Sequence, residues 1–140
     1  MTIKVALAGA GAFGIKHLDG IQNIPDVEVV SLISRDLAKT QEVADKYGIP
    51  HVTTKLEDSL AIKEVDAVIL CTPTQMHASQ SIACLEAGKH VQVEIPLCDI
   101  LSEGRAVVNL QKQTGLVAMC GHTRRFNPSH QYVHKKIKAG

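Results

Sequence analysis

The chain has 140 residues, of which 45% are hydrophobic and only 3% aromatic. That length suits one ordinary domain, and a core built from aliphatic side chains is typical of a parallel sheet buried on both faces. Fifteen basic and fourteen acidic residues leave a formal charge of +1, which excludes the broad electrostatic attraction that binds nucleic acids or anionic membranes. No apolar run is long enough to span a bilayer and no secretory signal pattern is present, so we expect a cytoplasmic location.

Strand-like and helix-like segments alternate along the sequence. The predicted strands are residues 2–8, 27–33, 51–54, 66–71, 89–94 and 116–121. The predicted helices are residues 12–24, 37–47, 56–61, 74–87 with Thr74 as its cap, 102–114, and a last one opened by Asn127 and Pro128. Gly48, Gly88, Gly115 and Gly140 each follow a predicted helix, where a left-handed residue is favoured. The alternation predicts an α/β fold with a doubly wound parallel sheet and a ligand at the carboxyl ends of its strands.

The glycine-rich segment GAGAFG, residues 9–14, joins the first predicted strand to the first predicted helix. In this context Gly9 permits a tight turn, Gly11 lets the backbone approach a pyrophosphate, and Gly14 lets the helix pack closely on the strand. The helix N-terminus then offers free N–H groups and a partial positive charge. The segment therefore predicts a dinucleotide-binding site.

The end of the second predicted strand bears on the choice between NAD and NADP. An NAD site usually places an acidic residue about 20 residues beyond the last glycine, to bind the ribose 2′-hydroxyl. Ser34 stands there instead and is followed by Arg35, and this pair suits a 2′-phosphate. Lys39 would add positive charge from the second helix. The competing interpretation uses Asp36 as the acidic residue, although Asp36 also fits the N-cap of that helix. We predict NADP as the cofactor rather than NAD.

Three segments together carry a family resemblance. The glycine turn, the stretch CTPTQMHASQSIACLEAGKHVQVEIP at residues 71–96, and GHTRRFNPSH at residues 121–130 resemble the Gfo/Idh/MocA oxidoreductase family. The resemblance covers essentially the whole chain and implies a Rossmann-type domain that binds NAD(P). The cofactor-binding residues expected from the turn, the second strand and the resemblance are Gly9, Gly11, Ala12, Phe13, Gly14, Ser34, Arg35, Cys71, Thr72, Pro73, Thr74, His77, Glu94 and Ile95.

One position departs from the family pattern. Where the family has Glu-Lys-Pro, this sequence has Glu94-Ile95-Pro96, and isoleucine offers no donor, acceptor or charge for moving a proton. This variant and the GHTRRFNPSHQY segment resemble a family member from bacterial aromatic catabolism. That likeness implies oxidation of the cyclic hemiacetal of a carboxylated semialdehyde, with NADP⁺ as hydride acceptor.

Four polar residues near the end of the sixth predicted strand are candidates for substrate binding and catalysis. Arg124 and Arg125 suit the recognition of substrate carboxylates, and His122 suits a proton acceptor because its ordinary pKa is near neutrality. Asn127 is a candidate for orienting the substrate or the nicotinamide. Each residue also has a purely structural interpretation. His122 could be a hydrogen-bonded histidine at a strand end, and Asn127 could only cap the last helix. One of the two arginines could point to solvent or form an ion pair.

The four cysteines have no C-x-x-C spacing, so we expect buried free thiols and no metal site. We expect residues 1–122 to form the dinucleotide-binding domain and residues 123–140 to begin a substrate domain that is otherwise missing here. Three hypotheses follow: an NADP-dependent dehydrogenase active in a longer chain, a dinucleotide-binding module without catalysis, and a dehydrogenase of a sugar or polyol. The expected partners are a small carboxylated substrate and further copies of the chain in a homo-oligomer.

Overall fold

The structure is a computed structural model that describes residues 2–140. Six strands form one sheet: β1 (Ile3–Ala8), β2 (Val27–Ile33), β3 (His51–Thr53), β4 (Ala67–Leu70), β5 (His90–Val93) and β6 (Ala118–Cys120). All neighbouring strands are parallel, in the order β3-β2-β1-β4-β5-β6. The chain therefore adds β2 and β3 on one side of β1, and then adds β4, β5 and β6 on the other side. The predicted doubly wound parallel sheet is confirmed, with its point of reversal between β1 and β4.

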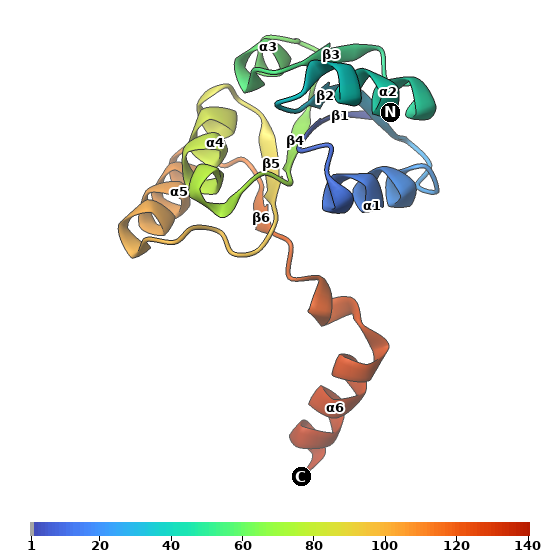
Figure 1. Ribbon diagram of the computed structural model, residues 1–140. Helices are drawn as coiled ribbons and strands as arrows, with labels where there is room; N and C mark the ends of the chain where they lie inside the picture. Colours follow the sequence, from blue (N-terminus) through green and yellow to red (C-terminus); the bar gives the residue numbers. More distant parts are fainter. Residues whose placement is uncertain (1) are drawn as a thin grey trace.

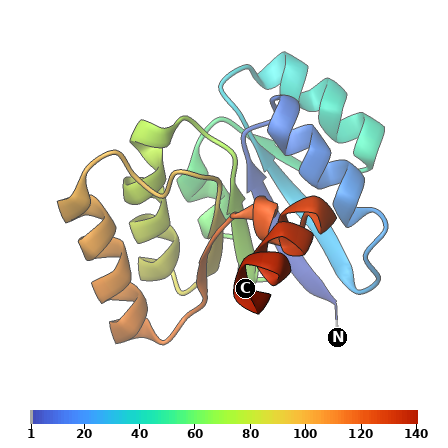
Figure 2. The same ribbon diagram turned by 90° about the horizontal axis from the view of Figure 1, so that it is seen from below.

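Helices cover both faces of the sheet (Figures 1 and 2). On one face lie α1 (Ala12–Ile21) and α2 (Leu37–Tyr47), and on the other lie α3 (Leu56–Leu60), α4 (Thr74–Glu86) and α5 (Leu101–Thr114). Each face has its own apolar core, which Leu18 and Ala44 join from the first helical layer and Leu85 and Val107 join from the second. Burial on both faces explains why the central strand β4, AVIL, is a continuous aliphatic run.

Local chemistry sets most of the helix ends. The Asp36 side chain caps α2 by accepting a hydrogen bond from the N–H of Lys39. Gly48, Gly88 and Gly115 have φ values of +68°, +74° and +70°, so each helix before them ends at a left-handed residue, as predicted. The predicted bounds of β2 and α2 are those observed.

Two predicted helix features are wrong. The first helix ends at Ile21 rather than at residue 24, because the side-chain amide of Asn23 donates to the Asp19 carbonyl oxygen and takes the place of the backbone N–H. Thr74 does not cap α4: Pro73 occupies the N-cap position, no side chain caps the helix, and Thr74 is the first helical residue.

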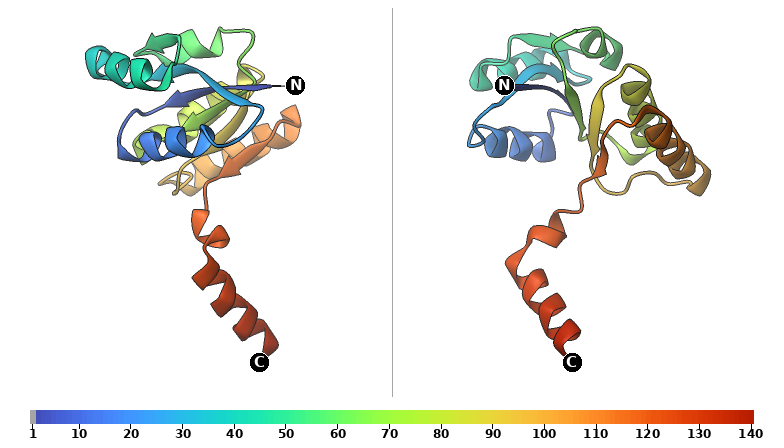
Figure 3. Two further views of the ribbon diagram at one scale, coloured as in Figure 1. Left: turned by 90° about the vertical axis from the view of Figure 1, so that its right-hand side faces the viewer. Right: turned by 180° about the vertical axis from the view of Figure 1, so that it is seen from behind.

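After β6 the chain leaves the sheet through η1 (Thr123–Phe126), a 3₁₀ turn, and enters α6 (Pro128–Ala139). Asn127 caps α6, as predicted, by accepting from the N–H groups of Ser129 and His130. Figures 1 and 3 show α6 projecting away from the sheet, with the C-terminus at its far end. Neither η1 nor α6 contains a buried residue. Within the described residues, no helix combines the length and apolar character needed to cross a membrane.

A single lysine holds the loop between α3 and β4. Lys89 Nζ donates to the carbonyl oxygens of Ile62 (3.1 Å), Lys63 (3.4 Å) and Val65 (2.7 Å). Replacing Lys89 by Met should lower the free energy of unfolding by about 1.5–3 kcal/mol, because charge-assisted hydrogen bonds are lost without replacement. Urea unfolding would measure this change. The matched Lys112→Met, at an exposed position of α5, should change stability by less than about 0.5 kcal/mol. Equal effects of the two substitutions would contradict the assignment.

Candidate functional site

The turn between β1 and α1 brings the backbone close to the end of β4. Gly9 has a φ of +107°, and its N–H donates to the Ile33 carbonyl oxygen (2.7 Å). A Cβ on Gly9 would lie 2.7 Å from the Cys71 carbonyl carbon, and a Cβ on Gly14 would overlap the Gly9 carbonyl oxygen. Gly11 has no atom within 4 Å of its Cβ position. The first and third glycines therefore permit close packing, and the second leaves the N-terminus of α1 open to an anion.

A cavity of about 570 Å³ lies at the carboxyl ends of β1, β2, β3 and β4, and we call it the dinucleotide cavity. Its volume is in the ordinary range for small-molecule sites. Among the predicted cofactor residues, those that line it are Gly9, Gly11, Ser34, Arg35, Cys71, Thr72 and Pro73. Other lining residues were not singled out from the sequence, among them Thr54, Lys55 and Met76. The predicted residues from three separate strand ends thus meet in one cavity.

The end of β2 gives this cavity a cationic corner. Ser34 and Arg35 both line it, and Lys55, just after β3, brings a second positive charge, while Glu57 of α3 is the one acidic residue among the described residues of the same lining. The Asp36 carboxylate accepts from the N–H of Lys39 (3.2 Å), and this hydrogen bond lowers the pKa of the carboxyl group. Lys39 Nζ lies 3.5 Å from the same carboxylate rather than in the cavity wall. Lys55 therefore supplies the charge that the sequence had led us to expect from Lys39.

A second cavity, of about 590 Å³, lies beside the ends of β5 and β6, and we call it the substrate cavity. Its lining brings together side chains from α1, the segment after β5 and the η1 turn. These residues are Phe13, Lys16, Glu94, Ile95, Thr123, Arg124, Phe126 and Asn127. Three predicted cofactor residues, Phe13, Glu94 and Ile95, thus face the same space as two predicted substrate residues, Arg124 and Asn127.

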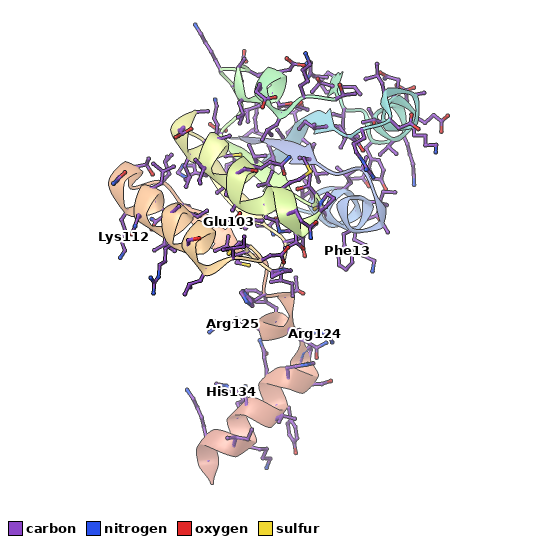
Figure 4. The ribbon with its side chains drawn as sticks, turned by 60° about the vertical axis from the view of Figure 1, so that its left-hand side comes forward. Phe13, Glu103, Lys112, Arg124, Arg125 and His134 are labelled. Carbon is purple, nitrogen blue, oxygen red and sulfur yellow. The ribbon has the colours of Figure 1, made fainter. Side chains whose placement is uncertain are left out.

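The two arginines lie on the η1 turn between the sheet and α6, where Figure 4 labels them. Arg124 borders both the substrate cavity and a third cavity of about 520 Å³. Of these two cavities, Arg125 borders only the third one. His130 and His134 of α6 complete the third cavity with Gln131, and no acidic residue lines it. His122 lies outside all three cavities, is exposed, and places Nδ1 3.3 Å from the Cys120 carbonyl oxygen.

One interaction at the site has no counterpart in the sequence analysis. His17 Nε2 lies 2.8 Å from Glu94 Oε1, and both side chains are largely shielded from solvent, with 24% and 13% of their surface exposed. The two residues are 77 positions apart. The available signal was the place of His17 on the second turn of α1, close to the glycine turn in sequence. The pair fixes the Glu94 carboxylate at the wall of the substrate cavity.

His77 is only 1% exposed and lies in the first turns of α4. Its Nδ1 and Nε2 are 2.7 Å from the carbonyl oxygens of Pro96 and Thr72, respectively. The ring therefore links the segment after β4 to the segment after β5 and has no exposed nitrogen for a ligand. Of the remaining predicted cofactor residues, Ala12 and Thr74 are the first residues of α1 and α4.

All four cysteines are free thiols, as predicted, but the prediction that they are buried holds only for Cys84, because the other three are partly exposed. Burial raises the pKa of Cys84 to about 12. Burial and then the nearby Glu94 charge raise the pKa of Cys71 to about 12. Both thiols are thereby held in the protonated form at neutral pH, and ordinary thiolate reactivity is suppressed.

Comparison with known proteins matches this chain to one family and to several characterised relatives. A model of an oxidoreductase family with an NAD-binding Rossmann fold, GFO_IDH_MocA, matches residues 3–122. A 4-carboxy-2-hydroxymuconate-6-semialdehyde dehydrogenase of Sphingobium sp. strain SYK-6 is 64% identical over 138 residues, which are 99% of this chain and 44% of that protein. An inositol 2-dehydrogenase of Rhodococcus erythropolis is 35% identical over 96% of this chain and 39% of its own length.

Solved structures of the same kind superpose closely. A scyllo-inositol dehydrogenase from Lactobacillus casei, with bound NAD(H) and scyllo-inositol, has a TM-score of 0.93 at 26% identity, covering 100% of this chain and 42% of its own. A 3-ketoreductase from Actinomadura kijaniata, in complex with NADP, has a TM-score of 0.92 at 25% identity, covering 100% of this chain and 44% of its own. This chain thus spans less than half the length of these relatives. With the family model matched over most of its residues, the chain belongs to the Gfo/Idh/MocA oxidoreductase family and contains its NAD(P)-binding Rossmann fold.

Proposed function

We propose that this chain is the NADP(H)-binding part of a dehydrogenase that oxidises the cyclic hemiacetal of 4-carboxy-2-hydroxymuconate-6-semialdehyde to 2-pyrone-4,6-dicarboxylate. The observation that carries the proposal is the dinucleotide cavity, in which the glycine turn, Ser34, Arg35 and the Cys71–Pro73 segment line one space. The relative that is 64% identical bears the name of this dehydrogenase and supports the substrate assignment.

The preference for NADP rests on the cationic corner of the dinucleotide cavity. Arg35 and Lys55 suit a 2′-phosphate, and Arg makes paired, charge-assisted hydrogen bonds to phosphate oxygens. The acidic side chain nearest in sequence, Asp36, is engaged as a helix cap and ion-paired with Lys39. An NAD-type contact from Asp36 to a ribose hydroxyl would have to compete with both interactions.

The proposed substrate carries carboxylates, and the substrate cavity offers cations for them. Arg124 and Lys16 line that cavity, and Arg125 borders the adjacent one. Ile95 occupies the position of the family's lysine and has no group that can move a proton, which argues against sugar or polyol oxidation by the family's usual chemistry. Asn127 lines the same cavity while its side-chain oxygen caps α6.

The hydroxyl proton of the hemiacetal must be accepted as its hydride leaves. We propose His122 for this role from its position after β6, although it lies outside the walls of the substrate cavity; its Nδ1 donates to the Cys120 carbonyl oxygen, which leaves the lone pair of Nε2 free. When bound, NADP⁺ supplies the hydride acceptor. The chain's own residues bind and orient the reactants and hold the proton.

Residues 123–140 begin a substrate domain in this proposal. They contain no buried residue, and their apolar side chains Phe126, Tyr132 and Ile137 are 77%, 63% and 74% exposed. The match to the family model ends at residue 122. We propose that further polypeptide and a second copy of the protein cover this surface, and that the 140-residue chain alone has negligible turnover.

The cofactor assignment is tested by calorimetric titration with NADPH and NADH. We expect tighter binding of NADPH, and Arg35→Ala should weaken it about tenfold or more because a charge-assisted contact is lost. NADH affinity should stay unchanged in this variant. Lys39→Ala is the matched control, since Lys39 pairs with Asp36 outside the cavity wall. Equal affinities for the two dinucleotides, or an equal loss of both in Arg35→Ala, would overturn the NADP assignment.

A further inference from the structure

Three side chains of the types that bind metal ions converge near the walls of the dinucleotide and substrate cavities. His17 belongs to α1, Cys71 directly follows β4, and Glu94 directly follows β5. Their ligand atoms, one imidazole nitrogen, one thiol sulfur and one carboxylate oxygen, all lie within 4.8 Å of one another. His17 Nε2 and Glu94 Oε1 are already 2.8 Å apart. Three elements far apart in sequence therefore present one ligand atom each to a common point.

The donor set selects a particular class of cation. Sulfur and imidazole nitrogen suit Zn²⁺ and similar borderline-soft divalent ions, whereas Mg²⁺ and Ca²⁺ prefer sites made only of oxygen. Three protein ligands with an open fourth position are typical of non-structural zinc sites. Bonds of about 2.0–2.3 Å to a tetrahedral ion place its ligands about 3.3–3.8 Å apart, so the observed separations require only small side-chain adjustments.

The surroundings also fit a bound ion rather than an exposed acidic patch. All three side chains are half-buried, so binding would not have to order three mobile side chains. Next to Glu94, the Gln92 side chain has its Nε2 3.5 Å from Glu94 Oε1. The Oε1 atom of Gln92 is buried and accepts no hydrogen bond from any residue in the described part of the chain. The side chain that contacts Glu94 through Nε2 therefore carries an oxygen without a partner.

We propose that His17, Cys71 and Glu94 bind one divalent cation of the Zn²⁺ class between the two cavities, and that Cys71 releases its thiol proton to solvent as the cation binds. Cys71 lines the dinucleotide cavity and Glu94 lines the substrate cavity, so the cation lies beside both ligands of the proposed dehydrogenase. The sequence predicted no metal site because it was searched for closely spaced cysteine pairs, and this site draws one residue from each of three segments.

The test is a titration of the purified, metal-free chain with Co²⁺, a spectroscopic substitute for Zn²⁺. Coordination of a thiolate to Co²⁺ produces a near-ultraviolet charge-transfer band that imidazole and carboxylate ligands do not give. We expect this band to saturate at one Co²⁺ per chain and to disappear on addition of Zn²⁺. The variants are Cys71→Ser, His17→Gln and Glu94→Gln. The first matched control is Cys98→Ser, which removes a partly exposed thiol outside the proposed site. The second is His134→Gln, which removes an imidazole on α6, where His130 and His134 line the third cavity.

Cys71→Ser should abolish the band, and His17→Gln and Glu94→Gln should each weaken Co²⁺ binding by at least the ~10–100-fold that supporting residues of metal sites contribute. Both controls should bind Co²⁺ as the unmodified chain does. Circular dichroism of each variant separates loss of a ligand from loss of the fold. Absence of the band in the unmodified chain, or its persistence in Cys71→Ser, overturns the proposal. NADPH titration without metal is a separate measurement, so a failed metal site leaves the cofactor assignment standing.

Discussion

Gly14→Ala should destabilise this chain by about 3 kcal/mol, at the upper end of what overpacking costs, whereas Gly11→Ala should cost only about 0.5–1 kcal/mol, as expected for alanine at the N-cap of α1. The reason is that a Cβ on Gly14 would overlap the carbonyl oxygen of Gly9 and lie 3.2 Å from a methyl group of Leu7. The backbone oxygen cannot rotate away as a side chain can. Around Gly11 there is no atom within 4 Å of the Cβ position.

The two glycine variants should behave in the opposite way towards the cofactor. Gly11→Ala adds a methyl group where the pyrophosphate approaches the N-terminus of α1, so NADPH affinity should fall in a protein of nearly normal stability. Urea unfolding and calorimetric titration measure the two effects separately. Gly20→Ala is the matched control, since Gly20 lies in α1 with open space around it and should become about 0.5–1 kcal/mol more stable. A stable Gly14→Ala protein with full NADPH affinity would show that the turn is not packed as described.

His77→Leu should produce the second large effect, a loss of about 1–3 kcal/mol. The substitution keeps apolar bulk but removes the ring N–H that the neutral imidazole offers to the carbonyl oxygens of Thr72 and Pro96, and an acceptor left without its donor costs about 1–3 kcal/mol. Because His77 ties the Thr72 segment to the Pro96 segment, NADPH affinity should fall as well. Chemical unfolding and NADPH titration check both results.

His134→Leu is the control for this substitution, because His134 is exposed on α6 and should tolerate leucine within about 0.5 kcal/mol. If His77→Leu were as mild as His134→Leu, the two 2.7 Å contacts would contribute little to stability. His77 would then only fill space beneath the dinucleotide cavity.

Most of the fold was predictable because each level of the sequence agrees with the next. Aliphatic runs of strand length, amphipathic helices between them and glycines at the helix ends all specify the same alternating pattern. The errors arose where a side chain competes with the backbone. Asn23 bonds to the Asp19 carbonyl oxygen and ends α1 early, and Pro73 takes the N-cap position that Thr74 was expected to fill.

The site was predictable only where its residues follow strand ends. In a doubly wound sheet these ends converge on one crevice, which is why Gly9, Ser34 and Cys71 meet in the dinucleotide cavity. Lys55 was missed because β3 is a short edge strand whose end carried no recognisable motif. The His17–Glu94 pair was missed because its members are 77 residues apart, and only the packing of α1 beside β5's end brings them together.

The central claim, that this chain binds a dinucleotide in the cavity built around residues 9–14, is tested most directly by titrating the purified chain with NADPH and NADH. The account predicts saturable binding of one dinucleotide per chain, tighter for NADPH, and weakened by Gly11→Ala in a chain that loses no more than about 1 kcal/mol of stability. Absence of binding to either dinucleotide at millimolar concentration, in a chain shown to be folded by its cooperative unfolding, would contradict it.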